Sequence, residues 1–174
     1  MRQFLIATAL TCAALCAGTI VHAQQPAAPA AAPAAVPTPL PDLGPVITLD
    51  QAMKAAAAAQ AEAQKNNWKV AVAITDNTGA LVYYLKMDGT QYGSISVAQD
   101  KAVSAALYRR PTAAFEAAIK AGNINVMLLK GANATPGGQP ILIGGRVAGG
   151  IGVSGVTAGQ DDQCAKAGLA AVGS

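Results

Sequence analysis

Seven of the ten prolines of this chain lie between residues 24 and 45, in a segment that is otherwise rich in alanine. Proline lacks a backbone N–H and fixes φ, so this segment favours an extended, semi-rigid linker over a packed helix or sheet. The part of the chain that can build a domain is therefore residues 46–174. Its length of about 129 residues suits one domain that buries roughly two-thirds of its unfolded surface.

The first 23 residues have the pattern of a secretory signal peptide. Arg2 precedes an apolar stretch, and small residues stand around Ala23, after which we expect cleavage. A membrane anchor is the less favoured alternative, because threonine and glycine dilute the apolar stretch and no stop-transfer charges follow it. We therefore expect a periplasmic or secreted protein that has no membrane span after cleavage.

Cleavage would remove the only histidine, His22, together with Cys12 and Cys16. The mature chain would keep one thiol, Cys164, and no imidazole, which excludes a Ser-His-Asp triad, a histidine-ligated metal centre and an intrachain disulfide. Charged residues make up only 12% of the chain, and its positive charges form no run. We therefore expect no nucleic-acid partner, and an oligomer in which other subunits cover part of the surface.

The periodicity of residues 46–174 predicts an α+β domain with an antiparallel sheet flanked by helices. Thr48 and Gln51 match a capping box that begins a helix running to about residue 65. Apolar side chains on both faces of the segment 68–75 indicate a sheet that is covered on each side. The other expected elements are strands over 68–75 and 80–87 with a turn at 76–79, helices from Ser96 to about Tyr108 and from Thr112 to near Gly122, a loop over 123–140, a hairpin over 141–154 and a helix over 158–171.

Residues 150–155 satisfy the pattern G-x-G-x-x-G, but we reject a dinucleotide site. Only 19 residues follow Gly155, and they contain neither a strand pattern nor an acidic residue after Asp162. Glycine in a strand permits close approach of another backbone or of a flat ligand. Two interpretations stay open: tight packing of a helix on Gly150 and Gly152, or a smooth ligand-binding patch that ends at Ser154.

Several motifs, in the same order along the chain, resemble the GlcG/HbpS-like proteins, which are often described as haem-binding or haem-degrading. They are D-x-x-G at 76–79, M-D-G at 87–89, A-x-x-K-A-x-S-A at 98–105, R-P-T at 110–112 and the closing stretch at 140–161. The resemblance covers nearly all of residues 46–174. It implies a profilin-like fold, assembly into a homo-oligomer, and binding of haem or a related tetrapyrrole.

Some members of that family are thought to use a histidine of the first helix on the haem iron, and the first helix predicted here has none. Iron would need another ligand, and we keep Met53 and Thr112 as candidate metal ligands. The simpler expectation is that Met53 fills the core beneath an alanine-faced helix. The other possible ligands are Met87, Met127, a tyrosine such as Tyr83 or Tyr84, and Cys164, which we expect to be an inert buried thiol.

The charged and small residues of the motifs are the candidates for ligand binding. Lys101, in the middle of a helix, can pair with an acid or hold a ligand carboxylate. Arg109 and Arg110 can hold propionates, although a helix C-terminus also favours their charge. The predicted cofactor-binding residues are Lys101, Arg109, Arg110, Thr112, Gly150, Gly152 and Ser154.

The function predicted from the sequence is an exported, oligomeric binding protein for haem or a related tetrapyrrole, with a haem-degrading or sensing role left open. One alternative is an enzyme that acts on a small carboxylate metabolite at a subunit-interface pocket, with Lys101, Ser154 and Asp161 as catalytic candidates. A second alternative is an assembly or stress module without a ligand. Enzymatic activity stays open, because no pair of nucleophile and base is visible.

Overall fold

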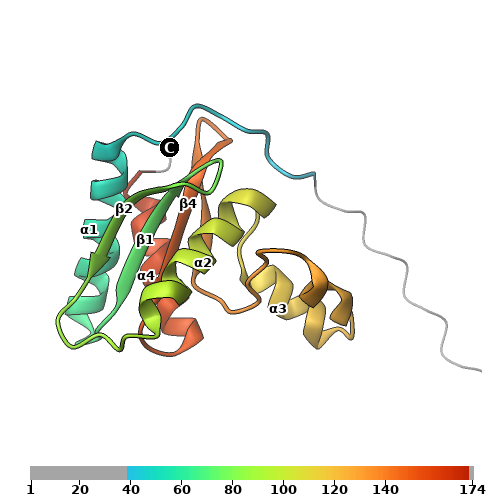
Figure 1. Cartoon of the computed structure of the whole chain (residues 1–174). Helices are drawn as coiled ribbons and strands as arrows, with labels where there is room; N and C mark the ends of the chain where they lie inside the picture. The colour runs from blue at the N-terminus through green and yellow to red at the C-terminus, as the bar shows by residue number, and fades with distance from the viewer. Residues whose placement is uncertain (1–38, 173–174) are drawn as a thin grey trace, which may run out of the picture. The chain divides into compact units, whose positions relative to one another are not determined.

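The computed structural model describes residues 39–172, so the predicted signal peptide and most of the predicted linker lie outside the described residues. A four-stranded antiparallel sheet, in the order β2-β1-β4-β3, carries helices on both faces (Figure 1). The elements are α1 (Leu49–Lys65), β1 (Ala71–Asp76), β2 (Leu81–Lys86), α2 (Ser94–Tyr108), α3 (Ala113–Lys120), the 3₁₀ helix η1 (Ile124–Leu128), β3 (Gly138–Ile143), β4 (Arg146–Ser154) and α4 (Ala158–Ala170). The predicted α+β class is confirmed.

Helices α1 and α4 cover one face of the sheet, and the predicted capping box begins α1. The Thr48 hydroxyl accepts from the Gln51 N–H at 3.3 Å, and the Thr48 N–H donates to Gln51 Oε1 at 3.0 Å. Because α1 buries a stripe made only of alanine, it approaches its neighbours closely. Met53 lies off this stripe and is 46% exposed, so the expectation that it fills the core is wrong.

Helix α2 lies on the opposite face of the sheet, directly against the glycines of β4 (Figure 1). A Cβ atom on Gly152 would collide with the backbone of Ala98 and Ala102 in α2, and a Cβ atom on Gly150 would collide with the Ala102 carbonyl. Glycine at these two positions therefore sets the distance between helix and sheet. Of the two interpretations of this segment, tight helix packing is the one that the structure shows, because α2 occupies the patch.

We predict that Gly152→Ala destabilises the fold by about 1–3 kcal/mol, because the added methyl has to push α2 away from β4. The matched control is Gly159→Ala in the first turn of α4, where an added Cβ meets nothing within 4 Å. The control should be neutral or slightly stabilising, since alanine is the better helix former. Urea denaturation of both variants measures the difference, and equal stabilities would contradict this packing.

Three boundaries differ from the prediction for local reasons. Helix α2 begins at Ser94, so Ser96 lies inside the helix and its hydroxyl bonds the Gly93 carbonyl. Thr112 precedes α3 without capping it, because its hydroxyl is engaged by residues of the following loop. The expected loop over 123–140 contains η1 and the first residues of β3.

The last residues of the predicted linker pack on the domain. The Val147 N–H donates to the Asp42 carbonyl at 2.8 Å, and the Gly44 N–H donates to the Val147 carbonyl at 2.8 Å, which forms a short parallel bridge. Arg146 Nε adds a bond to the Leu43 carbonyl at 2.8 Å. The prediction that residues 24–45 do not pair with a sheet is therefore wrong for these last positions, which satisfy backbone groups at the beginning of β4.

Candidate functional site

The motif residues Lys101 and Asp161 form an ion pair inside the domain. Lys101 Nζ lies 2.8 Å from Asp161 Oδ2 and donates a second hydrogen bond, at 2.9 Å, to the Val153 carbonyl. Lys101 is 1% exposed and Asp161 3% exposed. The pair thus joins α2, β4 and α4 at one point, and neither charge reaches solvent.

Hydrogen bonds also complete the environment of the Asp161 carboxylate. Asp161 Oδ1 accepts from the Val156 N–H at 3.1 Å, at the loop that leads into α4. Burial raises the pKa of Asp161 above its ordinary value, while the Lys101 ammonium and the N–H groups of Val156 and Gly155 lower it. A buried pair of this kind contributes little net stability compared with apolar side chains, but removal of one partner is costly because it strands the other charge.

We predict that Lys101→Met lowers the free energy of unfolding by about 3–5 kcal/mol near pH 8, because Asp161 is left as a buried charge without its partner. The cost should shrink toward pH 4. Burial raises the pKa of Asp161 in the native state, so at low pH the native carboxyl holds a proton that the unfolded chain does not. The stability that comes from this bound proton is present at low pH and is lost as the pH rises through the native pKa. The cost of the substitution is therefore larger at high pH. Urea titrations at several pH values measure the profile, which a cost independent of pH would contradict.

Ser154, the third catalytic candidate, directly follows Val153, whose carbonyl accepts a hydrogen bond from Lys101. Its side chain is 6% exposed, and its hydroxyl donates to the Ser94 hydroxyl at 3.2 Å. A serine nucleophile needs an adjacent base, and Ser94 cannot act as one. The structure therefore brings the three catalytic candidates into one buried region, where the observed hydrogen bonds serve to hold elements together.

The hydroxyl of Thr112 is fully buried and used in both directions. It donates to the Thr135 carbonyl at 2.8 Å and accepts from the Gly138 N–H at 3.0 Å. Gly138 is required here, because a Cβ atom at this position would meet the Lys101 carbonyl and the Thr112 methyl. In this conformation Thr112 thus attaches the loop before β3 to the beginning of α3, and no lone pair faces solvent.

The two arginines at the end of α2 point in different directions. Arg109 has a positive φ of 53° and donates from Nη1 to the Pro41 carbonyl at 3.1 Å, so it attaches the end of the predicted linker. Arg110 donates from Nε to the Tyr108 carbonyl at 3.1 Å and lies 5.6 Å from the centre of the Phe115 ring. The two guanidinium groups therefore do not form a shared binding site for two propionates, and Lys101 cannot join them because its ammonium is buried.

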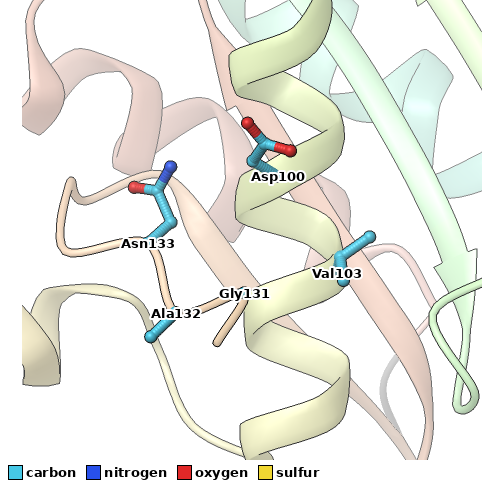
Figure 2. A pocket seen from close by; sticks show the side chains of 5 residues that line it. All are labelled: Asp100, Val103, Gly131, Ala132 and Asn133. Atoms are coloured by element: carbon cyan, nitrogen blue, oxygen red, sulfur yellow. The ribbon is translucent and has the colours of Figure 1, made fainter. Parts of the chain in front are cut away.

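A pocket of about 260 Å³ lies on the outer side of α2, between this helix and the loop before β3 (Figure 2). It is lined by Asp100, Val103, Gly131, Ala132 and Asn133. Sequence reasoning missed all five. Asp100 directly precedes the motif residue Lys101, and this position next to a buried helix residue was the one signal that could have drawn attention to it.

The described residues 39–172 contain no group of three histidine, cysteine or acidic side chains that could hold a metal ion. Cys164 is fully buried, which confirms the expected position of the thiol, and burial raises its pKa to about 11, which disfavours the reactive thiolate. Met87 is buried in the core, whereas Met53 and Met127 are 46% and 70% exposed. Among the sulfur-containing residues of the segment 39–172, Met53 and Met127 are therefore the exposed ones.

Comparison with known proteins decides the family. Residues 47–170 match the family model described as haem degrading protein HbpS-like. The chain belongs to the HbpS-like family. The resemblance seen in its ordered motifs is thereby confirmed.

Two relatives show how closely the HbpS-like chain follows its family. Protein GlcG of Escherichia coli K12 is 38% identical over 110 residues, which are 62% of this chain and 82% of GlcG. The crystal structure of a double mutant of Streptomyces reticuli HbpS superposes with a TM-score of 0.70 at 33% identity, covering 84% of this chain and all of that one. The fold and the family are therefore the same.

A third solved structure shares the fold of this HbpS-like chain. The crystal structure of a PduOC:heme complex superposes with a TM-score of 0.66 at 24% identity and covers 72% of this chain and 94% of that one. At this identity the comparison shows the fold alone.

Proposed function

We propose that this protein is an exported, oligomeric binding protein for haem or a related tetrapyrrole. The observation that carries the proposal is the family match over residues 47–170, since that family is described as haem degrading. The fold shared with a PduOC:heme complex adds support, because it shows that this architecture can accommodate a tetrapyrrole in another protein.

The pocket beside α2 is too small to enclose a haem in a single copy of the chain. The pocket of about 260 Å³ is smaller than the roughly 300–1,000 Å³ of ordinary small-molecule sites. Thr112 and Cys164 are buried, and the Thr112 hydroxyl is already paired. Bound haem would supply iron and a flat apolar ring, and we assign no catalytic step to it. We infer that the ring lies on an exposed face that a second copy of the chain completes.

The first helix offers one such face. Leu49 and Met53 are four residues apart on one side of α1, and Val46 precedes the helix by three residues; their side chains are 54%, 46% and 53% exposed, respectively. We call these three residues the α1 ridge. A methionine thioether is a known haem ligand, and Met53 stands on the helix from which some relatives are thought to supply a histidine. Binding there would depend mainly on contact with apolar surface.

Self-association and export rest on separate observations. Exposed apolar side chains and a charged fraction of only 12% favour a surface that other subunits cover. The signal pattern of residues 1–23 supports export to the periplasm or the medium. No helix among residues 39–172 is long and apolar enough to cross a membrane.

We predict that hemin added to the mature protein gives a saturable, shifted Soret band. Met53→Leu should keep saturable binding but move the Soret band to a different wavelength from that of the wild type, because it keeps the apolar volume of the side chain and removes the sulfur ligand. The matched control is Met127→Leu, at an exposed methionine of η1, which should leave the titration unchanged.

Two outcomes of this titration would contradict different parts of the proposal. An unchanged spectrum of the wild-type protein at micromolar concentration would remove the tetrapyrrole function. A normal shift in Met53→Leu would retain the function and remove Met53 as the ligand.

A further inference from the structure

The pocket beside α2 carries a charge that no described residue neutralises. The Asp100 side chain is exposed to solvent, forms no ion pair within 4.0 Å and accepts no hydrogen bond among residues 39–172, so its carboxylate is free to pair with a ligand. Its neighbour Lys101 cannot serve, because that ammonium is enclosed with Asp161 and the Val153 carbonyl. A ligand that enters this pocket therefore meets an unpaired negative charge.

Opposite Asp100, the side chain of Asn133 is held in one orientation. Its backbone N–H donates to the Ser104 hydroxyl at 2.9 Å, and its Oδ1 accepts from the Thr135 N–H at 2.8 Å. With Oδ1 engaged, Nδ2 is the free end of the carboxamide, and in Figure 2 it lies on the side of Asp100. Ser104 and Asp100 are one turn apart on α2, so the same helix positions both polar groups.

The remaining walls are small and apolar. Val103 belongs to the lining on the side of α2, although its side chain points away from Asn133, and Gly131 and Ala132 lie on the side of the loop (Figure 2). An added Cβ at Gly131 would meet nothing within 4 Å, so the approach over this residue is open. At about 30 Å³ per water molecule, a volume of about 260 Å³ accommodates a ligand on the order of ten non-hydrogen atoms.

We propose that this pocket is a binding site for a small organic cation, namely a primary ammonium with a neighbouring hydroxyl or carbonyl oxygen. The ammonium pairs with the Asp100 carboxylate, and the neighbouring oxygen accepts from Asn133 Nδ2. A carboxylate ligand is disfavoured by the charge of Asp100. The site is separate from the α1 ridge and does not depend on tetrapyrrole binding.

The test uses three molecules with a three-carbon skeleton and different charge: 2-amino-1,3-propanediol (cationic), glycerol (neutral) and glycerate (anionic). In ¹⁵N-labelled mature protein, the amino diol should give saturable chemical-shift changes at the amides of Gly131, Ala132 and Asn133. Glycerol should bind more weakly, and glycerate should leave these amides unchanged. Equal responses to the amino diol and glycerate, no saturable response, or a response confined to other amides would overturn the proposal.

The matched variants are Asp100→Asn and Asp88→Asn. Asp100→Asn keeps the shape of the side chain and should weaken binding of the amino diol roughly ten-fold, since a bond to a charged group is lost. Asp88 is an exposed residue of the turn after β2, and its variant should bind as the wild type does. Unchanged affinity in Asp100→Asn, with its other amide shifts preserved, would also overturn the proposal.

Discussion

A lysine ammonium inside a protein requires an opposite charge and hydrogen-bond acceptors, and the position of Lys101 is set by this requirement. Asp161 and the Val153 carbonyl meet it, at 2.8 Å and 2.9 Å. Lys101 belongs to α2 on one face of the sheet, Asp161 belongs to α4 on the other face, and Val153 belongs to strand β4 of the sheet itself. One lysine side chain can bridge these elements only if they pack closely. Gly150 and Gly152 of β4 and Gly138 permit this close packing, because a Cβ atom at each of them would collide with α2.

This arrangement separates structural motif residues from surface residues that can meet a ligand. Lys101, Thr112 and Ser154 all have their polar groups bonded inside the domain. The accessible chemistry lies on two other surfaces, the α1 ridge with its outward thioether and the pocket that contains Asp100. In the conformation described, the buried residues therefore determine how α2 is placed, and through α2 they determine how the pocket is shaped.

Local patterns in the sequence were sufficient for most of the fold. The capping box of α1, the Asp76 turn, in which the carboxylate accepts from two backbone N–H groups, and the Gly144-Gly145 turn depend on neighbours within a few residues. The pocket could not be predicted in this way, because Asp100 and Asn133 meet only through the tertiary path of the chain. The orientation of Met53 was also missed, since a helix rich in alanine does not reveal which of its faces is buried.

A double-mutant cycle of Lys101→Met and Asp161→Leu tests the role of the ion pair most directly. The free energies of unfolding of the two single variants and of the double variant are measured near neutral pH. Each single variant strands a buried charge, so the double variant should be more stable than either of them. If the costs of the two substitutions simply add, the two side chains do not act as a pair, and Lys101 does not hold α2, β4 and α4 together in the way described.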